Sequence, residues 1–177
     1  MPTKIVLFGP ECTGKSTLAV ALASHYQAPM VPEFLRTYSQ DKWDRQSKAV
    51  TESDIEPLIM GQLTQERDAL DQANQFVFCD TDILQLAVYF DYYYEAKWPT
   101  TLKSLCQQDS GTFYFLTAPD VPWVADDLRD RPLEREALFH IFEQALKIRD
   151  LTYMVLRGDE KARFAAATNY IDTHWPQ

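Results

Sequence analysis

The stretch GPECTGKS, residues 9–16, matches the phosphate-loop pattern GxxxxGK[ST]. A short apolar run, residues 4–8, precedes it, and residues 15–26 carry Leu18, Leu22 and Tyr26 at helical spacing. In this strand–loop–helix setting the loop's backbone N–H groups surround phosphate oxygens, and the helix points its positive end at the anion. Because glycine makes up only about 7% of average sequences, chance produces this pattern about once in a few hundred chains of this length. We therefore predict a site for nucleotide phosphates.

Each position of the loop has an expected role. Lys15 reaches the β- and γ-phosphates, and Ser16 ligates Mg²⁺. Glu11 is unusual because its charge repels phosphate, so it either points away or contacts the substrate. The residues expected to bind ATP are Gly9, Pro10, Glu11, Cys12, Thr13, Gly14, Lys15, Ser16 and Thr17.

Apolar runs and amphipathic stretches alternate along the chain. The predicted strands are residues 4–8, 30–32, 76–79, 113–116 and 153–156, and the predicted helices are 15–26, a long one from Thr51 through Leu70, 82–94, 134–149 and 159–175. This order predicts a single α/β domain over 1–177, a three-layer P-loop fold with a five-stranded parallel sheet. Its ligands are expected beyond the carboxyl ends of the strands.

Carboxylates follow two of these strands. Asp80 ends FVFCD, a Walker B pattern that delivers a carboxylate toward Mg²⁺. Asp82 contacts either the metal's waters or a substrate hydroxyl, unless it only caps the next helix. Glu33 follows the second strand and is our preferred proton acceptor for the substrate hydroxyl, with Asp82 and Asp80 as alternatives. Arg36 holds substrate or phosphate, or else forms a surface salt bridge with Glu33.

A charged segment, about residues 118–132, is expected to close over the site as a lid. Arg129 and Arg131 would stabilise charge on the transferring phosphate, although they also balance nearby aspartates. Trp123 suits stacking on an aromatic cation, beside Asp126, or pins the lid to the core.

Composition excludes several classes of partner. The net charge of -9 disfavours nucleic acid and anionic membranes, and no stretch is apolar enough to span a bilayer. The three cysteines, Cys12, Cys79 and Cys106, show neither a disulfide framework nor zinc spacing. We expect a cytoplasmic protein with a small-molecule partner, and a homo-oligomer is compatible with this sequence.

Four segments resemble the NadR-type nicotinamide riboside kinases. Residues 9–18, GPECTGKSTL, resemble GPESTGKSTL, and VPEFLR at 31–36 resembles VPEYAR. CDTD at 79–82 is similar to the family's DTD, and DVPWVADDLR at 120–129 is similar to DIPWVADGLR. The departures are Cys12, where serine is usual, and Asp127, where glycine is common.

The resemblance implies a nucleoside-kinase-like fold that uses ATP and Mg²⁺ to phosphorylate nicotinamide riboside at its 5′-hydroxyl, a step of NAD salvage. It implies that Glu33 orients or deprotonates this hydroxyl and that Trp123 stacks on the pyridinium ring. Bifunctional relatives carry an adenylyltransferase domain first. The present chain begins at the kinase strand, so we expect neither that activity nor DNA-binding regulation.

Two alternatives remain open. In the first, the protein is a kinase for another small acceptor, such as a deoxynucleoside or a nucleoside monophosphate. In the second, the chain is a nucleotide-binding switch or ATPase. The second is disfavoured because Thr81, not a glutamate that activates water, follows Asp80.

Overall fold

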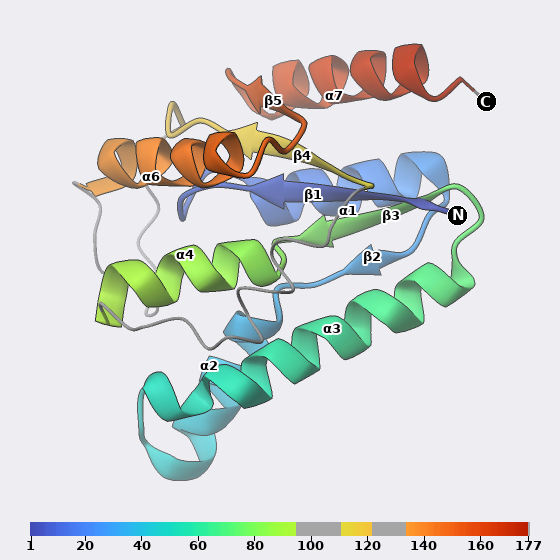
Figure 1. The fold of residues 1–177 in the computed structure, drawn as a ribbon. Helices are drawn as coiled ribbons and strands as arrows, with labels where there is room; N and C mark the ends of the chain where they lie inside the picture. The colour runs from blue at the N-terminus through green and yellow to red at the C-terminus, as the bar shows by residue number, and fades with distance from the viewer. Residues whose placement is uncertain (95–110, 122–133, 177) are drawn as a thin grey trace.

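A parallel sheet forms the centre of the computed structural model, which describes residues 1–94, 111–121 and 134–176 (Figure 1). Its strands are β1 (Thr3–Phe8), β2 (Met30–Val31), β3 (Phe76–Asp80), β4 (Thr112–Thr117) and β5 (Tyr153–Leu156). The spatial order is β2-β3-β1-β4-β5, and every adjacent pair is parallel. The predicted five-stranded parallel sheet is thus confirmed.

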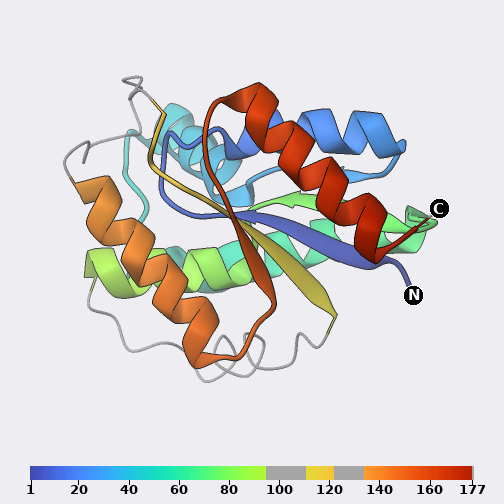
Figure 2. The same ribbon diagram turned by 90° about the horizontal axis from the view of Figure 1, so that it is seen from above.

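Helices cover both faces of this sheet. On one side lie α1 (Lys15–Tyr26) and α7 (Glu160–His174); on the other lie α3 (Ile55–Gln72), α4 (Ile83–Tyr94) and α6 (Arg135–Ile148) (Figure 2). Alternate residues of β1 face opposite sides of the sheet. Ile5 and Leu7 pack against α1 and α7, while Val6 and Phe8 belong to the core on the opposite side. All four are fully buried, so the strand is continuously apolar, as parallel strands are.

The helix α2 (Phe34–Gln46) was not predicted. None of its residues is fully buried, and only Phe34, Leu35 and Tyr38 at its start pack on the core, so the sequence FLRTYSQDKWDRQ lacks the long apolar stripe that would signal a helix. Contacts with the segment after it hold it in place, because Asp54 accepts hydrogen bonds from Tyr38 (2.8 Å) and Lys42 (2.5 Å). Asp54 ends a short 3₁₀ helix, η1 (Glu52–Asp54), which leads into α3 where the sequence predicted a helix start.

Among the described helices, none combines the length and apolar character that crossing a bilayer requires.

Candidate functional site

The phosphate loop connects β1 to α1, as predicted. Gly9 has a φ of 128° and Gly14 a φ of 79°, backbone conformations that side chains disfavour. A Cβ at Gly9 would also lie 2.9 Å from the carbonyl oxygen of Thr117, on β4. Glycine is therefore required at the start of the loop for two reasons, conformation and space. Cys12, at the tip, has a φ of 53° and is half-buried.

Lys15 lies within the loop, and its Nζ donates a 2.6 Å hydrogen bond to the carbonyl oxygen of Pro10. Burial lowers the pKa of this amine, while the carboxylates of Glu33 and Asp80 act in the opposite direction. The structure thus gathers one cation and two carboxylates from three separate segments. A bound polyphosphate would lie against the lysine, which the loop already orients.

The carboxylate of Asp80, at the end of β3, is 4% exposed, and its Oδ1 has no hydrogen-bond partner within the described residues. A buried carboxylate oxygen without a partner is costly unless a ligand satisfies it. Oxygen ligands of this kind suit Mg²⁺, which binds through one or two carboxylates plus phosphates. Ser16, exposed at the start of α1, supplies a hydroxyl beside the loop. These donors fit the predicted magnesium site.

Glu33 follows β2 and occupies the N-cap position of α2. Burial raises the pKa of its carboxyl group, although Lys15 opposes this shift. Arg36 forms an ion pair with it: Nε of Arg36 lies 3.7 Å from Oε2 of Glu33, and the arginine side chain is 45% exposed. The arrangement leaves Glu33 able to accept a proton from a ligand.

Asp82 has internal partners for both carboxylate oxygens. Oδ1 accepts hydrogen bonds from the backbone N–H groups of Leu84 (3.0 Å) and Gln85 (3.1 Å), and Oδ2 accepts one from the Tyr114 hydroxyl (2.7 Å). These bonds cap α4 and favour the helix-capping interpretation over the predicted substrate contact. Asp82 is accordingly a weaker candidate for the general base than Glu33.

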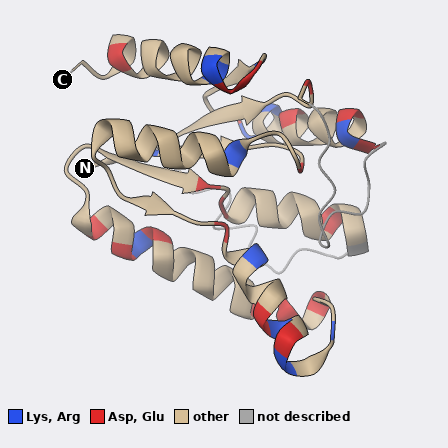
Figure 3. Cartoon of the chain, turned by 180° about the vertical axis from the view of Figure 1, so that it is seen from behind, with Lys and Arg blue, Asp and Glu red and all other residues tan. Residues whose placement is uncertain are grey.

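A cleft of about 850 Å³ extends from the phosphate loop along α2. One face of α2 forms its wall at helical spacing, with Arg36, Gln40 and Trp43 among its residues, and α4 contributes Tyr89 and Phe90. Trp43 is 55% exposed and was not predicted as a site residue, because α2 itself was not. Basic and acidic residues alternate along the sequence of the same helix, whose ribbon carries both colours in Figure 3.

Arg163, on α7, is a second residue that sequence reasoning missed. It is 3% exposed and donates hydrogen bonds to the carbonyl oxygens of Thr13, Ala118 (2.7 Å) and Gly158 (2.8 Å), and to the carboxylate of Asp120. Its guanidinium therefore ties the phosphate loop to the ends of β4 and β5. Arg163 is buried on the same side of α7 as Ala167 and Ile171, four and eight residues further on, but the alternation of polar and apolar residues in this helix is too weak to single it out from the sequence.

Most of the predicted lid, about residues 118–132, lies in the undescribed segment 122–133. Trp123, Asp126, Arg129 and Arg131 therefore lie outside the described residues, and their predicted roles stay predictions.

Several solved structures share the fold of this chain. NadR in complex with NR superposes with a TM-score of 0.80 at 18% identity, covering 98% of this chain and 51% of that one. Deoxyadenosine kinase from M. mycoides gives 0.66 at 15% identity (96% and 99% covered), and thymidylate kinase from Ehrlichia chaffeensis gives 0.64 at 14% (96% and 98%). The chain spans about half the length of the NadR chains it matches.

No curated protein sequence matches the chain. The sequence model of a family described as an AAA domain matches residues 4–163. This match covers the phosphate loop, the four strands that follow it, and the first turn of α7, up to Arg163. The chain therefore belongs to this AAA-domain family, and its fold is that of the P-loop nucleoside kinases.

Proposed function

We propose that the protein transfers the γ-phosphoryl group of ATP to a hydroxyl group of a small acceptor, and that this acceptor is nicotinamide riboside. One observation carries the proposal. A single cleft is lined by both the phosphate loop with Lys15 and the carboxylate of Glu33, and it continues for the length of α2. A donor site and an acceptor site can therefore meet at Glu33, as phosphoryl transfer requires.

The loop binds the phosphates of ATP, with its backbone N–H groups and the N-terminus of α1 facing the anion. Lys15 follows the γ-phosphoryl group into the transition state. Ser16 and Asp80 would hold Mg²⁺, which when bound neutralises phosphate charge. Most of the catalysis is then positioning and electrostatic stabilisation.

Glu33 accepts the proton of the acceptor hydroxyl, or orients that hydroxyl toward the phosphorus atom. Arg36 is placed to contact substrate or phosphate, because it lines the same cleft and its side chain is 45% exposed. In the lid, Arg129 and Arg131 would contact the phosphates on closure, and Trp123 with Asp126 would face the acceptor's ring.

Two facts favour nicotinamide riboside as the acceptor. Four segments, from the phosphate loop to the lid, resemble nicotinamide riboside kinases. A NadR structure that contains NR also has the same fold over 98% of this chain. The net charge of -9 further suits a cationic substrate.

Competition between nicotinamide riboside and uridine at fixed ATP tests the acceptor. A cation over an indole gains roughly 0.5–2 kcal/mol, and a nearby carboxylate adds to this preference. We expect kcat/KM for nicotinamide riboside to exceed that for uridine by about tenfold or more. The Trp123→Leu variant should reduce the ratio of kcat/KM for nicotinamide riboside to that for uridine. Equal use of both nucleosides would exclude the proposed substrate, whereas a wide gap that survives Trp123→Leu would exclude only Trp123 as the stacking residue.

The Glu33→Gln variant tests the proton acceptor. We expect ATP binding to stay intact while kcat falls at least about 100-fold, the scale of general base catalysis. Since burial raises the pKa of Glu33, activity of the native protein should fall as the pH drops through that raised pKa, and the variant should lack this acid limb. Steady-state rates across pH measure both effects. Full activity in Glu33→Gln would move the role to Asp80 or Asp82.

A further inference from the structure

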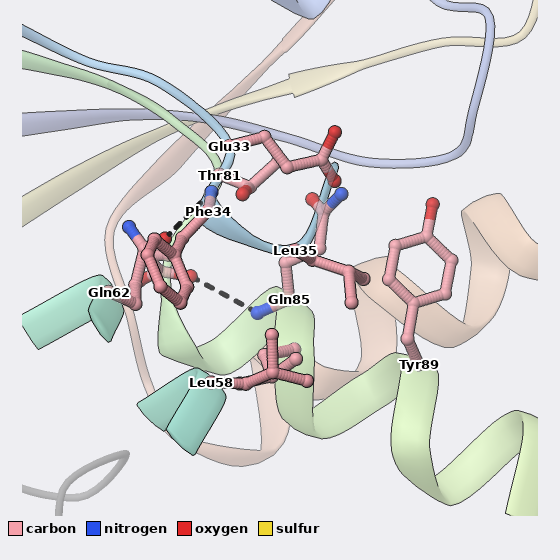
Figure 4. Close-up of a pocket in the computed structure, with 10 residues that line it drawn as sticks. Glu33, Phe34, Leu35, Leu58, Gln62, Thr81, Gln85 and Tyr89 are labelled. Atoms are coloured by element: carbon pink, nitrogen blue, oxygen red, sulfur yellow. Dashed lines mark hydrogen bonds between the residues drawn. The ribbon is translucent and has the colours of Figure 1, made fainter. Parts of the chain in front are cut away.

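A small nook lies beside the main cleft, between the start of α2, the helix α3 and the helix α4 (Figure 4). It shares Glu33, Leu35 and Tyr89 with that cleft, but no residue of the phosphate loop lines it. Its volume is about 10 Å³, the space that a single water molecule or hydroxyl group occupies.

Gln85 presents an unused hydrogen-bond donor there. Its side chain is 1% exposed, and Oε1 accepts a 3.1 Å hydrogen bond from the backbone N–H of Gly9. Because a backbone N–H can only donate, this bond fixes which end of the carboxamide faces the loop. The NH₂ end is buried and has no hydrogen-bond partner in the described residues.

The surroundings of this NH₂ group contain an acceptor. Figure 4 shows the carboxamide of Gln85 extending from α4 toward the carboxylate of Glu33, and both residues line the nook. A buried amide donor and a carboxylate beside one hydroxyl-sized space match a ligand group that accepts one hydrogen bond and donates another. A hydroxyl group does both.

We propose that Gln85 binds a ribose hydroxyl of the phosphoryl acceptor in this nook, and so makes the protein selective for hydroxylated acceptors. The inference rests on the proposed kinase function. The hydroxyl is not the one that receives the phosphoryl group, because that oxygen must lie next to the γ-phosphate at the loop, and the nook has no loop residue. Glu33 has two carboxylate oxygens, so it can accept hydrogen bonds both from the hydroxyl that receives the phosphoryl group and from the hydroxyl in the nook.

Two substitutions separate this role from the contact with Gly9. Gln85→Glu keeps an oxygen for the N–H of Gly9 but replaces the donor with an acceptor. Gln85→Met removes both. Gln75→Glu, at an exposed position before β3 and at the opposite end of that strand from Asp80, is the control for the added charge.

The measurement is kcat/KM for the best nucleoside acceptor and for its 2′-deoxy and 3′-deoxy counterparts. Native protein should prefer the intact nucleoside over at least one counterpart by tenfold or more, because the missing hydroxyl leaves Gln85 unpaired. Gln85→Glu should lose this preference and raise the acceptor KM at least tenfold, with the ATP KM and the melting temperature close to those of Gln75→Glu.

The outcomes separate the two proposals. If native protein phosphorylates no nucleoside in the panel, the kinase proposal and this inference both fail. If it phosphorylates them and Gln85→Glu keeps the native preference, only the inference fails, and the nook holds an internal water. Should Gln85→Glu not fold, the neutral Gln85→Met decides, since a preserved preference there also overturns the role of Gln85.

Discussion

Replacement of Lys15 with alanine is expected to lower kcat/KM by at least about 100-fold, the scale seen when one preorganised electrostatic contact to a transition state is removed. The ammonium group is buried in the loop and already held by the carbonyl oxygen of Pro10. It therefore needs little reorganisation when the γ-phosphoryl group moves. Burial lowers its pKa, Glu33 and Asp80 oppose this shift, and a bound anion would favour the charged form further.

Steady-state phosphorylation of nicotinamide riboside measures this effect, with ATP varied. The matched control is Lys161→Ala, because Lys161 is exposed on α7. Circular dichroism would establish that both variants are folded. Near-native activity in folded Lys15→Ala would refute the kinase proposal itself, because the proposal places this charge on the γ-phosphoryl group in the transition state.

The sheet and the loop were predictable because each strand leaves a clear local signal. FVFCD, for example, is a continuous apolar run because β3 is covered on both faces, and it ends in the charged residue that the site requires. GPECTGKS is equally local, since both of its glycines meet backbone requirements within the loop. The strand order, in contrast, depends on pairings between distant residues.

The missed features depend on tertiary contacts. No residue of α2 is fully buried; only its first turns pack on the core, through Phe34, Leu35 and Tyr38, and hydrogen bonds to Asp54 add to this. Trp43 was missed together with the helix. The capping role of Asp82 was foreseen only as an alternative, because Tyr114, its third partner, lies on another strand. Gln85 and Arg163 act through Gly9 and Thr13, which are far away in the sequence. No spacing rule connects such pairs.

Arg163→Met should destabilise the protein and weaken ATP binding together. Its guanidinium is buried and joins three carbonyl oxygens and Asp120, so removal leaves these acceptors without their donor. Breaking a fully buried pair costs about 3–5 kcal/mol, and because the Asp120 side chain is 33% exposed, we expect the lower end of this range. For a chain of this size, that lowers the melting temperature by roughly 10 °C. Because one carbonyl belongs to Thr13, we also expect the ATP KM to rise while the acceptor KM stays unchanged.

Thermal unfolding with and without ATP and magnesium, together with both KM values, tests this prediction. The control is Arg67→Met, which removes an arginine that is 72% exposed.

The pH dependence of stability gives a second test, through Asp120. Burial raises the pKa of its carboxyl group, but the Gly158 N–H and Arg163 outweigh this and hold it below its usual value. Ionised Asp120 therefore stabilises the folded protein. This stabilisation is fully present above the usual pKa of an aspartate and is lost as the pH falls through the lowered pKa of Asp120. Without Arg163 the pKa of Asp120 should be higher, so the Arg163→Met variant should lose this stabilisation at a higher pH than the native protein. If its melting temperature and ATP KM both match those of Arg67→Met, Arg163 does not hold the loop.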